Sequence, residues 1–86
     1  MQRTAISYKF TYGEVEIIDG AMVAVEKTFT AFNAFNLDRA HKMFTKATGY
    51  GAKVIKKTER IEALYEMPDE RFFTNAEVKN EKIEEI

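Results

Sequence analysis

The chain has 86 residues, of which 45% are hydrophobic and 31% charged, with a formal net charge of −1 at pH 7. This length allows one domain, and the composition is that of a globular protein and not of a disordered one. The chain contains no cysteine, which excludes disulfides, thiolate zinc sites and thiol catalysis.

The first third of the sequence predicts a β-hairpin. In residues 4–12 apolar and polar side chains alternate, which indicates a strand with one buried face. After Gly13 the alternation shifts by one residue, which favours a β-bulge there, with a plain turn as the alternative. Asp19-Gly20 lies between two β-prone runs, and this pair is a strong hairpin signal. The second strand should therefore cover about residues 21–29.

An amphipathic helix is expected next. Asn36 can cap its N-terminus, and Gly49 and Gly51 can end it. Between them, residues suited to a buried face recur at helical spacing, and these are Leu37, Ala40, His41, Phe44 and Ala47.

Two further strands are predicted, at about residues 52–57 and 61–67, with residues 59–60 as either a turn or a continuation. Pro68 suits the first position of a short helix. Residues 77–86 are charged and could be a frayed helix, an edge strand or a disordered tail. The sequence thus predicts an α+β fold, in which a small antiparallel sheet packs against one amphipathic helix. We assign the domain to residues 1–76 and a charged tail to residues 77–86.

Few residues suit catalysis. His41 is the only histidine, and its place on the apolar stripe favours a packing role over that of a base or a metal ligand. There is no glycine-rich phosphate loop and no nucleophile elbow. We therefore expect no enzyme, no cofactor, no metal and no small-molecule substrate. No apolar run approaches the roughly 20 residues that span a bilayer, and no signal-peptide core follows the N-terminus, so we expect a cytoplasmic protein.

The charges are unevenly distributed. Residues 1–58 carry nine Lys/Arg against five Asp/Glu, whereas residues 59–86 carry four against nine. Arg39, Lys42 and Lys46 recur at i, i+3 and i+7, so they project from one helix face. A solvated polar face is the simpler interpretation. The alternative is a DNA-binding surface that neutralises backbone phosphates, formed by the basic residues Arg3, Lys9, Arg39, Lys42, Lys46, Lys53, Lys56 and Lys57.

One segment points to a known family. Residues 65–72, Y-E-M-P-D-E-R-F, and the start Met1-Gln2-Arg3 resemble the histone-like double-stranded DNA-binding protein of small protein-primed Bacillus phages. The expected order of elements is similar as well. Residues 29–35, F-T-A-F-N-A-F, depart from the family in being richer in Phe, and an exposed pair of these rings would mark a protein–protein interface.

The resemblance implies a dimer or multimer that coats phage DNA with little sequence preference and assists replication initiation and early transcription control. It also implies that Arg3, on an N-terminal arm ahead of the first strand, contacts the minor groove. The competing hypothesis is an interaction module that mimics DNA and inhibits a host protein. Its acidic residues would be Glu59, Glu62, Glu66, Asp69, Glu70, Glu77, Glu81, Glu84 and Glu85.

Overall fold

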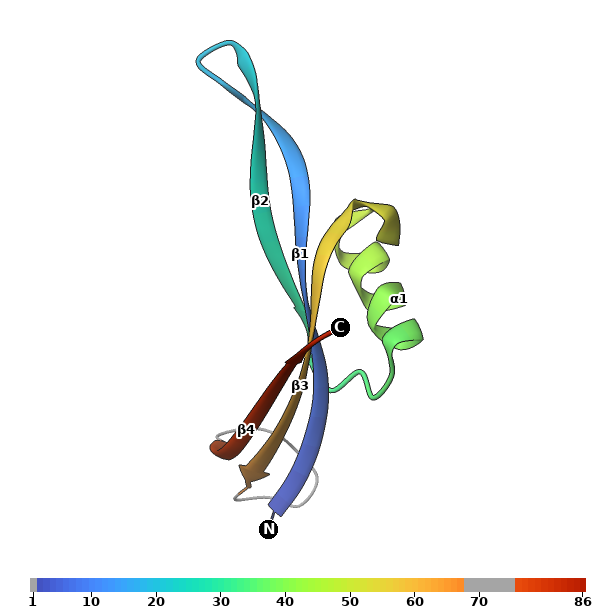
Figure 1. The fold of residues 1–86 in the computed structure, drawn as a ribbon, viewed down its shortest axis with the longest axis vertical. Coiled ribbons are helices and arrows are strands. Elements are labelled where there is room, and N and C mark those ends of the chain that lie inside the picture. Colours follow the sequence, from blue (N-terminus) through green and yellow to red (C-terminus); the bar gives the residue numbers. More distant parts are fainter. Residues whose placement is uncertain (1, 68–75) are drawn as a thin grey trace.

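The computed structural model of the protein describes residues 2–67 and 76–86. Within these ranges the strands are β1 (Gln2–Ile18), β2 (Ala21–Ala31), β3 (Ile55–Glu66) and β4 (Glu77–Glu85). The helix α1 (Leu37–Thr48) follows β2, and the 3-10 helix η1 (Ala52–Val54) precedes β3. The strands form one antiparallel sheet in the order β2-β1-β3-β4, and α1 packs on one face of it (Figure 1). The predicted α+β class is confirmed.

Aromatic side chains hold α1 on the sheet. Alternation along β1 turns Phe10 and Tyr12 toward the helix, and both are buried. The ring of Phe44 meets them edge-on, with centroids 5.7 and 5.0 Å away. Phe29 of β2 adds a third edge contact, at 5.8 Å. The core therefore lies between α1 and the centre of β1, at the position that the alternation of residues 4–12 predicts.

Both predicted ends of the helix are confirmed. The Asn36 side chain accepts a hydrogen bond from the Arg39 backbone N–H at 2.8 Å, as an N-cap does. At the other end Gly49 adopts the left-handed conformation, with φ of 80°, and its N–H donates to the Thr45 carbonyl at 2.8 Å. The sequence therefore determines the length of α1 locally, before any packing is considered.

The two strands predicted at residues 52–57 and 61–67 are in fact one strand, β3. Glu59 and Arg60 continue it, because they pair with Lys9 and Tyr8 of β1. The long partner strand gives residues 59–60 backbone hydrogen-bonding partners that a turn would lose. Residues 52–54 form η1 instead of strand.

The bulge predicted at Gly13 is wrong in position. Thr11 pairs with Lys57 and Tyr12 with Ile55, so the extra residue is Lys56, on β3. Pairing between β1 and β2 runs through Gly13 without a break, so the alternative of a turn is wrong as well. A Cβ atom at Gly13 would lie 3.1 Å from Cε of Lys56. The glycine therefore gives the bulged lysine room to cross β1.

Beyond Gly13 the hairpin projects from the molecule as a two-stranded arm, which we define as residues 13–26 (Figure 1). β3 begins at Ile55, opposite Tyr12, so only β2 pairs with β1 in the arm. Asp19 and Gly20 have φ values of 53° and 80°, as the predicted hairpin turn requires. The arm has no single buried face, unlike residues 4–12. Its apolar residues therefore no longer follow the earlier alternation, and the pattern shifts after Gly13.

The predicted C-terminal tail is an edge strand instead. β4 pairs with β3 from Glu66↔Glu77 to Glu59↔Glu85, and all its residues are exposed. Of the three alternatives for residues 77–86, the edge strand is the one observed, so this segment belongs to the same sheet as the rest of the domain. The predicted Pro-led helix falls in residues 68–75, outside the described residues.

Replacing Phe44 with Ala tests the packing of α1 on the sheet. It removes a fully buried ring and three ring contacts, so the free energy of unfolding should fall by about 3–5 kcal/mol. Urea unfolding followed by circular dichroism measures this change. Thr45→Ala, at an exposed position of the same helix, is the control and should change it by less than about 0.5 kcal/mol. Equal effects of the two variants would contradict this assignment of the core.

Candidate nucleic-acid interface

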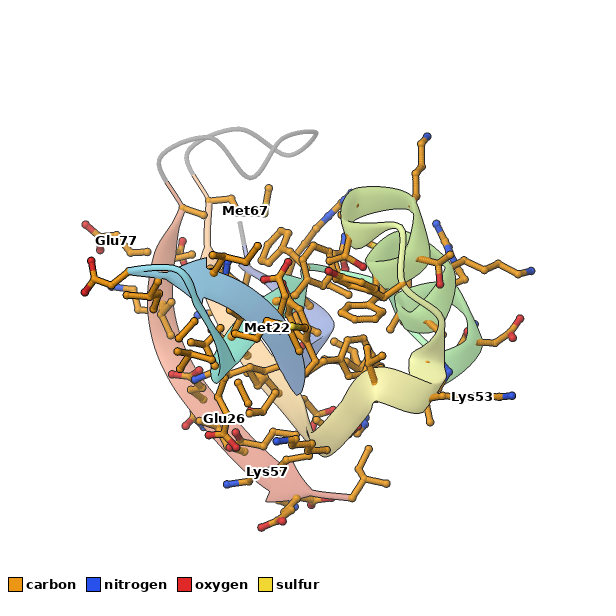
Figure 2. All side chains as sticks on the ribbon, turned by 90° about the horizontal axis from the view of Figure 1, so that it is seen from above. Met22, Glu26, Lys53, Lys57, Met67 and Glu77 are labelled. Atoms are coloured by element: carbon orange, nitrogen blue, oxygen red, sulfur yellow. The ribbon has the colours of Figure 1, made fainter. Side chains whose placement is uncertain are left out.

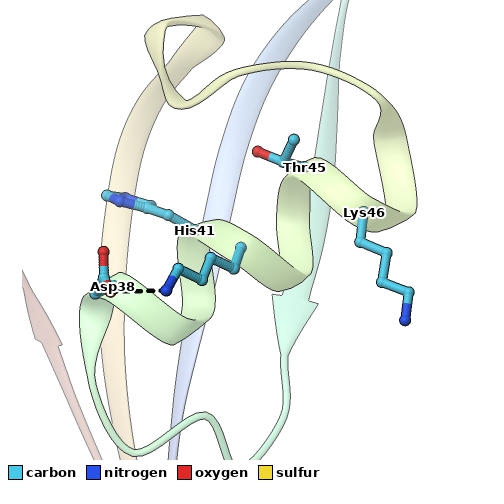
Figure 3. Close-up of a pocket in the computed structure, with 5 residues that line it drawn as sticks. Asp38, His41, Thr45 and Lys46 are labelled. Carbon is cyan, nitrogen blue, oxygen red and sulfur yellow. Dashed lines mark ion pairs between the residues drawn. The ribbon is translucent and has the colours of Figure 1, made fainter.

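The outer side of α1 carries three cationic side chains. Arg39, Lys42 and Lys46 are exposed, whereas Ala40 and Phe44, on the opposite side, are buried. The Nζ atom of Lys42 lies 3.4 Å from the Asp38 carboxylate, one helical turn away (Figure 3). Both side chains of this pair are about four-fifths exposed, so solvent screens the pair and Lys42 remains available to an incoming anion.

Arg39 is positioned by an aromatic ring. Its guanidinium carbon lies 5.8 Å from the centroid of Phe35, a cation–π contact at the N-terminal end of α1. Phe35 is itself 53% exposed. Arg39 is itself exposed, so its N–H groups can donate to phosphate oxygens.

Lys53 extends this cationic surface beyond the end of α1. It lies in η1 and is exposed, and Figure 2 shows it pointing outward on the helix side of the molecule. We call Arg39, Lys42, Lys46 and Lys53 the helix face. Within the described part of the chain, Lys42 is the only one of the four with an ion pair.

The remaining predicted basic residues lie elsewhere. Lys9 and Lys57 follow the strand alternation opposite to that of Phe10, so they belong to the sheet face that α1 does not cover. Figure 2 shows Lys57 and Lys53 pointing to opposite sides. The structure therefore divides the predicted cationic surface in two, because the sheet lies between the helix face and these strand lysines.

Arg3 and Lys56, the last two predicted basic residues, lie apart from the helix face and from each other. Arg3 is exposed, but it lies inside β1 opposite Tyr65, and not on a free arm ahead of the first strand as predicted. The reason is that β1 begins at Gln2 and pairs with β3 from its first residues. Lys56 lies at the bulge, with Nζ 3.8 Å from the Glu26 carboxylate at the base of the arm.

His41 has the packing role that the sequence predicts. Its ring centroid lies 5.2 Å from that of Phe10, and its side chain is half-buried on the apolar side of α1. Among residues 2–67 and 76–86, no group of three or more His, Asp or Glu side chains is placed to hold a metal ion.

The Phe-rich segment before the helix, residues 29–35, has one ring in the core and two rings on the surface. Phe29 packs against Phe44. Phe35 is exposed beneath Arg39, and Phe32 is 42% exposed with its ring centroid 5.9 Å from that of Tyr65. Both surface rings therefore have an aromatic or cationic neighbour within the same chain.

An ionic cluster at the base of the arm was not anticipated from the sequence. Lys27 of β2 lies 2.8 and 2.7 Å from the carboxylates of Glu14 and Glu16. The Tyr50 hydroxyl, in the segment after α1, donates to Glu14 at 2.9 Å. The hydrogen bond from Lys27, followed by that from Tyr50, lowers the pKa of Glu14 below its ordinary value of 4.5. This cluster connects the arm to the segment that carries the helix face.

Acidic side chains gather at the other end of the sheet. The seven described glutamates of the competing hypothesis all lie on β3 or β4, and Glu59 is directly opposite Glu85. Basic neighbours compensate part of this charge, since Lys82 lies 3.0 Å from Glu84 and its hydrogen bond lowers the pKa of that carboxyl.

No family model, no curated protein and no solved structure matches this chain. The resemblance to the phage histone-like protein therefore stays a prediction from its residues alone. Among the described residues, no helix is both long and apolar enough to cross a bilayer.

The lowered pKa of Glu14 predicts an acid-sensitive contribution to stability. Because the folded-state pKa is below the unfolded value, this contribution is present above about pH 4.5 and is lost as the pH falls through the folded pKa. Glu14→Gln should therefore flatten the pH dependence of the urea midpoint below pH 4.5. Glu85→Gln, an exposed carboxylate for which no ion pair is described, serves as the control. Identical profiles for the wild type and Glu14→Gln would contradict this role of the cluster.

Proposed function

We propose that the protein binds double-stranded DNA without sequence preference, through the helix face. The observation that supports this proposal is the set of four exposed cations, Arg39, Lys42, Lys46 and Lys53, with the exposed Asp38 as the one acidic residue of α1 and η1. Packing of Phe44 into the core turns these cations away from the sheet, so an extended polyanion can approach α1 without displacing any element of the fold.

The chemistry of the helix face favours contacts to the phosphate backbone. Arg39 and Lys46 lie seven residues apart in α1, or roughly 10 Å along the axis at 1.5 Å per residue. Lysine ammonium groups act as point charges toward phosphates and carry no sequence information there. Asn and Gln, whose amides read adenine in a bidentate manner, are absent from α1 itself.

The resemblance noted from the sequence supports the same proposal and adds to it. It favours a histone-like phage protein that multimerises on DNA, organises the genome, and assists replication initiation and early transcription control in the cytoplasm of a bacterial host. Arg3 stays a candidate for minor-groove contact. It would act from the strand β1, on a different surface from the helix face.

The salt dependence of DNA binding tests this proposal. If each of the four cations neutralises one phosphate, the logarithm of the association constant should fall with the logarithm of salt concentration with a slope of about −3.6. A fluorescence anisotropy titration of a labelled duplex over a series of salt concentrations measures this slope, and two unrelated duplex sequences should give equal affinities. Absence of binding at low salt would refute the proposal.

Paired variants locate the binding surface. Lys46→Ala should reduce the magnitude of the salt slope by about 1 and weaken binding to all duplexes alike, because it removes one phosphate contact. Lys57→Ala is the matched control, an exposed lysine on the opposite sheet face, and should leave the slope unchanged. Arg3→Ala asks whether the sheet contributes as well. A larger effect of Lys57→Ala than of Lys46→Ala would place the interface on the sheet instead.

The clustering of seven glutamates on β3 and β4 favours a second candidate function, mimicry of DNA toward a basic host protein. This function predicts no binding to any duplex at low salt and a stable complex with a basic protein partner. Charge reversal at Glu62, which is partly exposed opposite Lys82, should weaken that complex. Lys79→Glu on the neighbouring strand, which adds negative charge, should not weaken it.

A further inference from the structure

Five of the large apolar side chains that are exposed lie close together in the arm. Ile17 and Met22 are 77% and 78% exposed, and Val15 is 57% exposed. All three lie on one face of the ribbon, and Ile18 and Val23 on the other face are partly exposed as well. An isolated two-stranded ribbon is marginally stable in water, and contiguous exposed apolar residues mark interaction sites. The arm therefore has the features of an interaction site.

The outer edge of β2 offers the backbone for such a contact. Among the described residues β2 is the last strand on its side of the sheet, so none of them forms a strand that could pair with the N–H and C=O groups that point away from β1. Residues 20–25, G-A-M-V-A-V, contain no charge and no proline. Natural edge strands are protected by charges, prolines, bulges or covering elements, and no charge, proline or bulge protects this segment.

The other strand edges that the structure describes are poorly suited to pair with the outer edge of β2. Six of the nine residues of β4 are charged, and the arm's other edge, on β1, carries Glu14 and Glu16. DNA is disfavoured as well, because the arm bears Glu14, Glu16, Asp19 and Glu26 and no basic residue. An uncharged edge offers a charged strand no opposite charge to pair with, whereas apolar side chains on two facing edges stabilise each other. Within this molecule the edge that matches β2 is therefore β2 of a second copy.

The sequence of β2 is self-complementary in one antiparallel register. With Val23 opposite Val23 of the second copy, Met22 lies opposite Ala24 and Ala21 opposite Val25. Large residues then meet small ones. Asp19 and Gly20 form the hairpin turn, so the paired segment ends where Ala21 meets Val25, and it contains no charged residue.

We propose that two copies of this chain associate through the outer edges of β2, antiparallel, about a two-fold axis at Val23. The contact joins the two arms into one four-stranded ribbon and places Met22 and Ala24 of both copies on a common apolar face. This dimer would provide the self-association that the proposed function includes, and the inference rests on that part of the proposed function. The tests of this dimer contain no DNA. Dimerisation can therefore fail while DNA binding holds, and DNA binding can fail while dimerisation holds.

The contact is small, and this sets its expected strength. Five paired residues, 21–25, extend over roughly 17 Å at 3.3 Å per residue, as a single strand pair. Such an interface lies at the low end of the size range for specific protein contacts. We therefore expect a dimer that dissociates on dilution, visible as a concentration-dependent mass in sedimentation equilibrium.

A cysteine cross-link tests the register directly, because the chain has no cysteine of its own. Val23→Cys should form a covalent dimer with oxidised glutathione, since paired residues have Cα atoms about 4.5–5.5 Å apart, within disulfide range. Ile17→Cys is the control. It is more exposed, but its counterpart in the second copy would lie three strand spacings away, roughly 14 Å. Cross-linking of Ile17→Cys at the same rate as Val23→Cys would overturn the proposal.

Charge variants provide the second test. Val23→Lys and Val23→Glu each place like charges on the two-fold axis, so each protein alone should be monomeric. Their mixture should regain dimers by sedimentation equilibrium, because the opposite charges then meet. Val23 is partly exposed in the arm, away from the aromatic core, so the fold should survive, and circular dichroism checks this. Recovery of no dimers on mixing, or a wild-type protein that stays monomeric at high concentration, would overturn the proposal.

Discussion

The packing of Phe44 against the aromatic face of β1 is the interaction on which the rest of the structure depends. It holds α1 to one side of the sheet and so decides which helix residues are buried. The cations of α1 face outward because Phe44 faces inward, since the two sets lie on opposite sides of the same helix. The same packing leaves the other sheet face, with Lys9 and Lys57, on a separate surface.

The elements that the sequence predicted correctly are those fixed by local chemistry. Asn36 and Gly49 end the helix through hydrogen bonds within one turn, and Asp19-Gly20 supplies the two positive φ angles of the hairpin turn. The continuity of β3 and the pairing of β4 could not be predicted in this way. Each depends on a neighbouring strand that supplies backbone partners, and no local pattern in residues 55–66 or 77–85 encodes that neighbour.

The residues of the candidate site also divide into those placed by local spacing and those placed by tertiary packing. Arg39, Lys42 and Lys46 share a face because helical spacing alone places them there. Whether the strand lysines join that face depends on which side of the sheet the helix covers, which is a tertiary property. The bond from Tyr50 to Glu14 joins residues 36 positions apart, so no sequence window contains it. The one sequence feature that could have indicated this ionic cluster is the pair of carboxylates at Glu14 and Glu16, two residues apart on one strand face.

An NMR titration can show whether the helix face receives the phosphate backbone of DNA, as proposed. Amide resonances of the ¹⁵N-labelled protein are followed while a short duplex is added at low salt. The largest changes in chemical shift are expected in residues 38–53, whereas the resonances of β4 should stay in place. Changes confined to the sheet, or none at saturating duplex, would contradict this proposal.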